Sequence, residues 1–196
     1  MYVVGVDEAG RGPLAGPVAV GVIRVADGFD FEAAFPGLND SKKLTEKRRE
    51  ELFVRLQEEI ALGTVSAVVH LSSAAKIDAY GIVPAVRGAL YKGVRKLLPE
   101  PSEGKVFLDG SLYAPQEYAQ ETVIGGDGKV PAIMLASIAA KVTRDRYMKK
   151  LAPKYPQYRF EVHKGYGTKL HYELLREHGP CEIHRTTFLH LVPESV

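Results

Sequence analysis

Carboxylate side chains follow β-like runs at three places in this sequence. Asp7 and Glu8 end the first such run, Asp109 ends a second, and Asp127 follows a third. Strand ends bring side chains to the edge of a sheet, where a site is rigidly supported and open to solvent. Acids gathered there would repel one another unless cations neutralised them. The pattern therefore indicates a metal site.

An all-oxygen donor set suits Mg²⁺ or Mn²⁺, and no Cys/His arrangement near these acids favours zinc. Two such ions roughly 3.5 to 4 Å apart can activate water and stabilise a leaving oxygen in phosphodiester hydrolysis. The alternative is that these acids merely belong to turns, because glycine follows both Asp109 and Asp127 and Asp-Gly pairs are common in turns. Adjacent strand residues point to opposite faces, so we expect the strand to end or twist if Asp7 and Glu8 serve one site.

The composition predicts one soluble domain. With 196 residues, of which 45% are hydrophobic and 26% charged, the chain can bury one substantial core. A formal net charge of +2 permits nucleic-acid binding without requiring it. The single cysteine, Cys181, excludes an internal disulfide and favours a reducing, cytoplasmic setting. No apolar stretch reaches membrane-spanning length, so we expect no membrane partner.

The order of the predicted elements is typical of an α/β fold, with a mixed sheet covered by helices. A strand over residues 64–71 alternates poorly, which predicts burial on both of its faces. Strands are predicted near residues 2–6, 18–23, 64–71, 105–110 and 121–124, and helices near 45–59, 83–98, 132–150 and 169–178.

Five segments together resemble the ribonuclease HII family, the type 2 ribonucleases H of bacteria and archaea. The opening segment reads Asp-Glu-Ala-Gly-Arg-Gly-Pro, and the last contains Gly-Tyr-Gly. Either motif alone would be a weak signal, whereas their combination and order are specific. The five segments span most of the chain and are residues 7–17, 39–44, 108–110, 136–145 and 163–168.

The resemblance implies a ribonuclease H-like fold, with a central sheet of about five strands, flanking helices and a helical C-terminal segment. Residues 1–196 would form a single catalytic domain in which residues 155–196 contact substrate. The expected enzyme is a monomer that cuts the RNA strand of RNA–DNA hybrids. It would also cut 5′ of single ribonucleotides embedded in duplex DNA, leaving 3′-hydroxyl and 5′-phosphate ends, and so serve ribonucleotide and primer removal.

Matching the motifs by position places the four acids of the family on Asp7, Glu8, Asp109 and Asp127. They would bind Mg²⁺ or Mn²⁺, with two ions in the substrate complex. Asp145 is a rival for the fourth position because it lies in a strongly matching segment. Asp127 is preferred, because the fourth acid of the family lies just before the helix predicted near residues 132–150, whereas Asp145 lies within it.

The glycines of the first motif allow close approach of the backbone to a substrate. Gly10 and Gly12 can direct N–H groups at a 2′-hydroxyl, and Arg11 between them adds positive charge. The resemblance pairs this turn with Tyr166, whose ring would pack against the sugar. We infer that a ring placed where a second 2′-hydroxyl would clash could enforce the junction between a ribonucleotide and a deoxyribonucleotide.

A short basic segment resembles a family loop that lies near substrate phosphates. Its members are Ser41, Lys42 and Lys43, and positive donors there would stabilise charge on the scissile group. Without the resemblance, a solvated run of surface charge would be the favoured interpretation, because lysine pairs are common on protein surfaces.

Several further polar residues could support the site from behind. Ser137, Lys141 and Asp145 are spaced four apart and would share one helix face, where Lys141 and Asp145 could instead form a structural ion pair. His163 could carry a proton, contact a phosphate or hold its loop by a hydrogen bond. We favour the last of these roles.

Two alternatives to the main interpretation concern activity. Ribonuclease HIII shares the fold but resembles the opening motif less well, and cleavage of a single embedded ribonucleotide would separate the two. A hybrid-binding module without catalysis is the other alternative, and the presence of all four acids argues against it. A His-x-x-Cys-x-x-His spacing at His178, Cys181 and His184 lacks the four recognised ligands of a zinc site, and we expect Cys181 to be a packed thiol.

Overall fold

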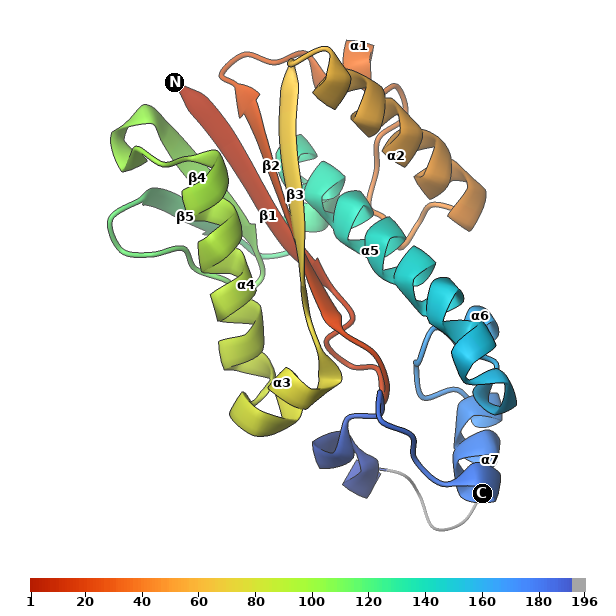
Figure 1. The fold of residues 1–196 in the computed structure, drawn as a ribbon. Helices are drawn as coiled ribbons and strands as arrows, with labels where there is room; N and C mark the ends of the chain where they lie inside the picture. Colours follow the sequence, from red (N-terminus) through yellow and green to blue (C-terminus); the bar gives the residue numbers. More distant parts are fainter. Residues whose placement is uncertain (192–196) are drawn as a thin grey trace.

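The computed structural model describes residues 1–191. Its centre is a 5-stranded sheet in the order β3-β2-β1-β4-β5 (Figure 1). β2 pairs antiparallel with both β1 and β3, while β4 is parallel to β1 and to β5. The predicted mixed sheet is confirmed. The strands are β1 (Tyr2–Ala9), β2 (Val18–Ala26), β3 (Val65–Ser72), β4 (Gly104–Asp109) and β5 (Ala119–Val123).

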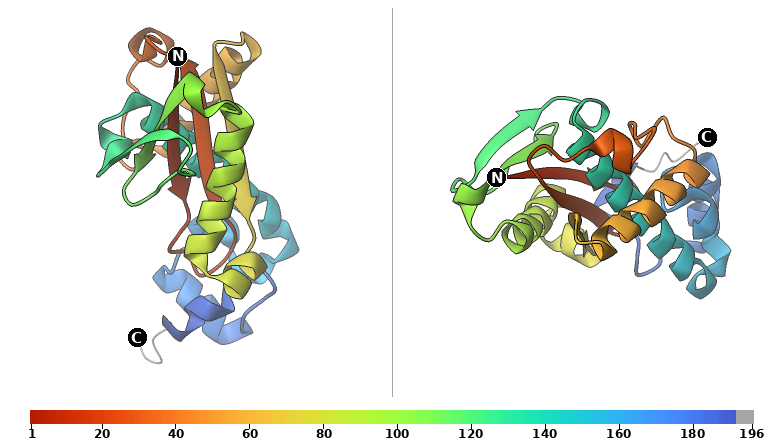
Figure 2. Two further views of the ribbon diagram at one scale, coloured as in Figure 1. Left: turned by 90° about the vertical axis from the view of Figure 1, so that its left-hand side faces the viewer. Right: turned by 90° about the horizontal axis from the view of Figure 1, so that it is seen from above.

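Helices cover both faces of the sheet, with α4 on one side and α5 and α2 on the other (Figures 1 and 2). The α-helices are α1 (Phe31–Ala34), α2 (Glu46–Ala61), α3 (Ala74–Tyr80), α4 (Ile82–Leu97), α5 (Pro131–Leu151), α6 (Phe160–His163) and α7 (Lys169–His178). Short 3₁₀ helices are η1 (Pro101–Glu103), η2 (Gly126–Gly128), η3 (Ala152–Lys154), η4 (Pro156–Tyr158) and η5 (Thr186–Leu191). Thr45 caps the start of α2, where its side chain accepts a hydrogen bond from the Arg48 N–H.

Two glycines of the sheet let α5 lie directly on it. A Cβ atom added to Gly5 would lie 2.2 Å from the carbonyl oxygen of Ala132, and one added to Gly21 would lie 2.3 Å from that of Ala136. Only hydrogen fits between backbones this close. This close packing places Ser137 beside the end of β1, where it is hydrogen-bonded to Asp7.

Side chains of β1 alternate between the two faces, as strand geometry requires. Val4 and Val6 are fully buried in the core that includes the apolar face of α4. Gly5 faces α5, so Asp7 shares the α5 face and Glu8 shares the α4 face. The two acids therefore leave the strand in opposite directions.

β3 differs from the sequence-based expectation. Most of its residues are half-exposed rather than buried on both faces. β3 is an edge strand, with β2 as its only neighbour in the sheet, and an edge cannot be covered as a central strand is. Strand order depends on the whole topology and is not encoded in local alternation.

Among the described residues, no helix is both long enough and apolar enough to span a membrane. The predicted C-terminal extension, residues 155–196, begins with η4 and continues with α6 and α7, which lie at one end of the sheet beyond α5 (Figure 1). Residues 192–196 of that extension lie outside the described part of the chain.

Candidate active site

Three acids from separate segments meet at one end of the sheet. Asp7 near the end of β1, Asp109 at the end of β4 and Asp127 in η2 each offer an oxygen, and these oxygens all lie within 4.8 Å of one another. β1 and β4 are parallel neighbours, so their ends bring the first two acids together. Within residues 1–191, this is the one group of three or more acidic, histidine or cysteine side chains with such spacing.

Asp109 also fixes the third acid. Its Oδ1 accepts hydrogen bonds from the backbone N–H groups of Gly126 at 2.7 Å and Asp127 at 3.3 Å. The turn η2 is thereby tied to the end of β4. Asp127 lies four residues beyond the end of β5 at Val123, so its place is set by this turn and not by a strand end as predicted.

The pKa of Asp7 shows that this acid of the cluster needs nearby positive charge in order to ionise fully at neutral pH. Burial raises the pKa of Asp7 to about 8, with further increases from the negative charges of Glu8 and Asp109, against a hydrogen bond from Ser137 that lowers it. Lys42 donates from Nζ to Oδ2 of Asp127 at 2.7 Å, and this hydrogen bond raises the pKa of Lys42. A cation bound beside Asp7 would oppose the rise in the pKa of this acid and favour the ionised carboxylate.

Glu8 borders the same cleft from the opposite face of β1. The strand continues regularly to Ala9, so the expectation that it ends or twists at the acids is wrong. What ends is the pairing with β4, whose last partners are Val6 and Leu108, and the edge of β1 is open beyond them. A side chain from either face can therefore reach the cleft.

One carboxylate oxygen of Glu8 has no hydrogen bond. Its Oε1 accepts from Nη1 of Arg11 at 3.2 Å, while its Oε2 is buried without a partner among the described residues. Burial raises the pKa of Glu8, and the charge of Arg11 opposes that rise. A buried, unpaired carboxylate oxygen is costly alone and is suited to a hard cation. The donor set thus fits divalent metal ions.

Asp7, Glu8 and Asp109 line a cleft of about 540 Å³. It contains most of the residues predicted from the motifs, from both ends of the chain. The lining residues are Asp7, Glu8, Ala9, Gly10, Arg11, Ser41, Lys42, Arg49, Asp109, Ser137, Lys141 and Tyr166. Gly12, Lys43, Asp127, Asp145 and His163 are not among them; Asp127 joins the cluster through its spacing to Asp7 and Asp109.

The two glycines of the first motif have different surroundings. Gly10 has a φ of +89°, and a Cβ atom there would lie 2.1 Å from Nε of Arg144. Gly12 is exposed, and an added Cβ atom would have no neighbour within 4 Å. Gly10 is thus required by the fold, whereas the open space at Gly12 allows a ligand to approach the backbone.

Tyr166 is held between cations. Its ring centroid lies 5.0 Å from Nζ of Lys141 and 5.1 Å from Cζ of Arg144. The preceding residue, Gly165, accepts backbone hydrogen bonds from Leu14 at 2.9 Å and Ala15 at 3.3 Å. The tyrosine loop and the glycine loop over residues 10–17 are therefore joined directly.

A chain of buried histidines holds the tyrosine loop from behind. The Tyr166 carbonyl accepts from Nδ1 of His171 at 2.9 Å, so Nε2 of the neutral ring accepts from Nε2 of His184 at 3.1 Å. Nδ1 of His184 in turn accepts from the Cys181 N–H at 2.9 Å. Burial lowers the pKa of both histidines to about 4, which keeps this arrangement neutral. His171 lies in none of the sequence motifs, and His184 stands out in the sequence only for its spacing to Cys181 and His178, which does not indicate this role.

His163 lies in the same buried group. Its Nε2 donates to the carbonyl of Tyr158 at 2.7 Å, and its Nδ1 accepts from the N–H of Gly165 at 3.1 Å. Its ring stacks on that of His171, with centroids 4.2 Å apart. These contacts hold the loop and leave both ring nitrogens occupied.

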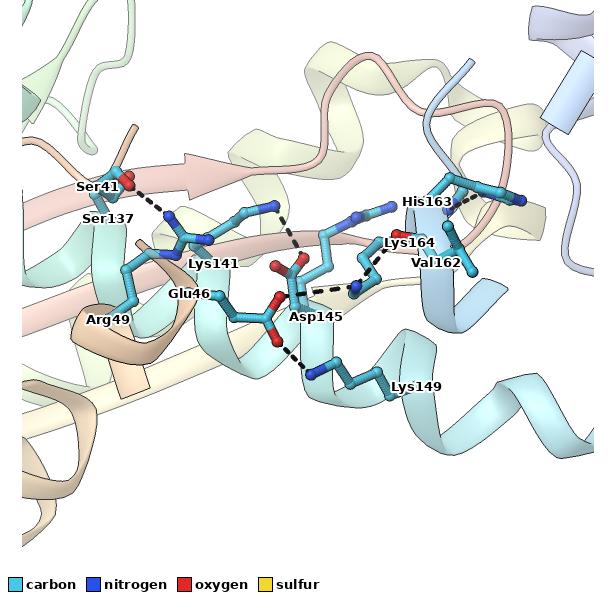
Figure 3. Close-up of polar contacts among 12 residues, drawn as sticks. Ser41, Glu46, Arg49, Ser137, Lys141, Asp145, Lys149, Val162, His163 and Lys164 are labelled. Atoms are coloured by element: carbon cyan, nitrogen blue, oxygen red, sulfur yellow. Dashed lines mark hydrogen bonds and ion pairs between the residues drawn. The ribbon is translucent and has the colours of Figure 1, made fainter. Parts of the chain in front are cut away.

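Polar contacts along α5 connect the basic loop to the rest of the site (Figure 3). Oγ of Ser41 lies 2.8 Å from Oγ of Ser137, and the Ser41 carbonyl accepts from Nη1 of Arg49 at 2.9 Å. One turn further along the helix, Lys141 donates to Asp145 at 3.0 Å. The shared face predicted for these α5 residues is present, and Asp145 is engaged in an ion pair behind the cleft.

Comparisons with known proteins agree with this geometry. A family model described as Ribonuclease HII matches residues 4–191. A Ribonuclease HII of Caldicellulosiruptor bescii is 44% identical over 188 residues, covering 96% of this chain and 86% of that protein.

Solved structures with the same fold include the ribonuclease H2 from Pyrococcus horikoshii OT3. It superposes with a TM-score of 0.71 at 27% identity, covering 95% of this chain and 93% of that one. Bst-RNase HIII in complex with Mn²⁺ gives a TM-score of 0.70 at 18% identity, covering 91% of this chain and 63% of that one.

Proposed function

This chain belongs to the ribonuclease HII family, and from that premise we propose that its cleft cuts the phosphodiester bond on the 5′ side of a ribonucleotide. The activity itself follows from the family: cleavage of RNA in RNA–DNA hybrids and at single ribonucleotides embedded in DNA. The observation that carries the proposal is the meeting of Asp7, Asp109 and Asp127 within 4.8 Å. The products would carry 3′-hydroxyl and 5′-phosphate ends.

The acids are the proposed ligands of Mg²⁺ or Mn²⁺, with two ions in the substrate complex. Asp7, Asp109 and Asp127 supply adjacent oxygens, and Glu8 supplies its unpaired Oε2. Mn²⁺ in the structure of Bst-RNase HIII, which has the same fold, supports this choice of metal. Divalent ions at such a site lower the pKa of water and stabilise charge on the phosphate and the leaving oxygen.

The basic residues of the cleft would position the scissile phosphate. Lys42 projects from the 39–44 loop toward the acids, where its ammonium group can neutralise charge that develops on the phosphoryl oxygens. Its backbone is held by Asp40, whose Oδ1 accepts from the Lys42 N–H at 2.9 Å. Arg11 contributes positive charge from the opposite side, beside Glu8.

Recognition of the ribonucleotide is assigned to the glycine loop and Tyr166. The open space at Gly12 allows the sugar to approach the backbone, where N–H groups can bind the 2′-hydroxyl. Tyr166 lines the cleft together with Gly10 and Arg11 and would pack against the sugar. The hydrogen bonds from Leu14 and Ala15 to Gly165 keep the two recognition elements in a fixed relation.

The test is a labelled duplex with one embedded ribonucleotide, compared with a long RNA–DNA hybrid and an all-DNA duplex. Cleavage in Mg²⁺ or Mn²⁺, with none in EDTA, should give a single cut 5′ of the ribonucleotide. End-labelling should find 3′-hydroxyl and 5′-phosphate termini. An intact single ribonucleotide alongside a cleaved hybrid would indicate the preference of ribonuclease HIII and would remove the proposed role of the glycine loop.

A further inference from the structure

We propose that Arg185 is a positioning residue that aims the backbone N–H groups of Arg11 and Gly12 at the 2′-hydroxyl of the substrate. This inference rests on the proposed function, because it assumes that the glycine loop reads the ribonucleotide. Arg185 directly precedes η5, remote in sequence from that loop, and is not among the residues that line the cleft.

The guanidinium group of Arg185 binds backbone carbonyls of the glycine loop on its buried side. It donates from Nη2 to the Gly10 carbonyl at 2.7 Å, from Nη1 to the Arg11 carbonyl at 2.8 Å and from Nε to the Gly16 carbonyl at 2.9 Å. Its own backbone N–H donates to Leu14 at 2.8 Å. Arg185 is fully buried, so none of these donors is shared with solvent.

The geometry of the peptide bond sets the direction of the next two donors. The chain has no cis peptide bonds, and in a trans peptide the N–H of one residue points opposite to the carbonyl of the residue before it. Because Arg185 binds the carbonyls of Gly10 and Arg11, the N–H groups of Arg11 and Gly12 point away from it. They therefore face the open side of the loop.

These two N–H groups are available to a ligand. Within residues 1–191, neither donates a hydrogen bond to the protein. The surface beyond them is open, because no atom lies within 4 Å of a Cβ atom added at Gly12. Two adjacent N–H groups on one open face can both donate to a single oxygen such as that of a 2′-hydroxyl.

Packing alone does not account for an arginine at this position. The described residues place no carboxylate in contact with its guanidinium group, and burial lowers its pKa to about 9 with a further contribution from the charge of Arg144. A buried cation is costly, and an apolar side chain could fill the same volume. An apolar side chain has no hydrogen-bond donors, whereas the planar guanidinium group can donate to three carbonyls at once.

The experiment compares binding with and without a single 2′-hydroxyl. Affinities of the full chain for a duplex with one ribonucleotide and for the matched all-DNA duplex are measured in EDTA, so that cleavage does not interfere. In Arg185→Lys the ammonium group cannot span three carbonyls, so the preference for the ribonucleotide should fall by roughly fivefold to tenfold. Affinity for the all-DNA duplex should change by less than about twofold, because phosphate contacts remain.

Arg24→Lys is the matched control. Arg24 also binds a backbone carbonyl, that of Leu97 at 2.8 Å, but near the opposite end of β1 and β2 from the acids. The Arg24→Lys variant should keep the wild-type binding preference for the duplex with one ribonucleotide. An unchanged preference in Arg185→Lys, or an equal loss in Arg24→Lys, would overturn the inference. A wild-type protein with no preference at all would instead refute the proposed function.

A measurement on the wild-type chain covers the case in which Arg185→Lys fails to fold. The amide proton resonances of Arg11 and Gly12 should move downfield when the ribonucleotide duplex is added, because both donors become hydrogen-bonded. The all-DNA duplex should leave them in place. Resonances that respond identically to both duplexes would contradict the proposed direction of these donors.

Discussion

Lys42 contacts Asp127 directly, with 2.7 Å between Nζ and Oδ2. The lysine side chain is 76% exposed while that of the acid is 9% exposed, so an exposed cation covers the buried acid from the solvent side. The same ammonium group is positioned to serve a phosphate and to compete with a metal ion. These two roles can be separated by experiment.

Lys42→Gln should strengthen metal binding and weaken catalysis. Removing the ammonium group frees Oδ2 of Asp127, so the affinity for Mn²⁺ should rise by about twofold to fivefold, a small effect because the lysine is exposed. Turnover should fall by roughly tenfold to a hundredfold, because a donor to the phosphate is lost. Calorimetric titration with Mn²⁺ and single-turnover cleavage measure the two effects. Lys47→Gln, at an exposed lysine of α2, should change neither. A parallel loss of metal affinity and turnover would contradict competition.

Metal binding should release a proton at about pH 7. The ordinary pKa of Asp7 is 3.8, and burial raises it to about 8 in the folded, metal-free protein. A metal ion requires the ionised carboxylate, so affinity should rise with pH by up to about tenfold per unit until about pH 8. Calorimetry in buffers of different ionisation enthalpy counts the protons released. Equal heats in all buffers would show that Asp7 is already ionised.

The same shift predicts how the stability of the metal-free protein depends on pH. The folded state holds the Asp7 proton more tightly than the unfolded chain, so the free energy of unfolding is greatest below about pH 4 as far as this group is concerned. It should decrease as pH rises from 3.8 to about 8, where both states are ionised. Thermal melts of wild type and Asp7→Asn across this range isolate the effect. Parallel melting curves for the two proteins would contradict it.

The two glycines of the first motif should respond differently to alanine. Gly12→Ala should leave the melting temperature within about 2 °C of wild type, because the added methyl group meets no protein atom, yet lower kcat/KM by about tenfold by obstructing the substrate. Gly10→Ala should lower the melting temperature by several degrees in addition to lowering activity. The φ of +89° at this position and the contact with Arg144 both oppose a side chain. Equal stability losses would place Gly12 in the fold rather than at the substrate.

Replacing Tyr166 with Ala should damage cleavage far more than folding. The ring lines the cleft and is held mainly by Lys141 and Arg144, contacts worth about 0.5 to 2 kcal/mol each. A loss of about a hundredfold in kcat/KM on the single-ribonucleotide duplex is expected, with a melting temperature only a few degrees lower. Unchanged turnover with a large loss of stability would assign Tyr166 to packing.

The sequence predicted the acids well because their position depends on local rules. Asp7 and Asp109 follow strands whose apolar runs are visible, and parallel pairing joins them. Asp127 also follows an apolar run, but its exact place could not be predicted, since it is fixed by the hydrogen bonds from its turn to Asp109. The direction of Glu8 needed the register, because only the pairing shows that β4 ends before β1 does.

The supporting residues were beyond sequence reasoning. Arg144 and Arg185 are both fully buried, whereas composition and periodicity place arginines on the surface. The partners of Arg185 are carbonyls, which no side-chain pattern encodes, and they lie about 170 residues away in the chain. The histidine chain behind Tyr166 is similarly assembled from α7 and the segment after it.

The most direct test of the metal-dependent site is single-turnover cleavage of a duplex with one ribonucleotide in Mg²⁺ by Asp7→Asn and Asp109→Asn, with Asp145→Asn as the matched acid outside the cleft. Circular dichroism verifies that each variant is folded. The two cleft variants should lose roughly a thousandfold or more in rate, while Asp145→Asn retains most of the wild-type rate. Wild-type cleavage by a folded Asp7→Asn or Asp109→Asn protein would contradict the assignment of these acids.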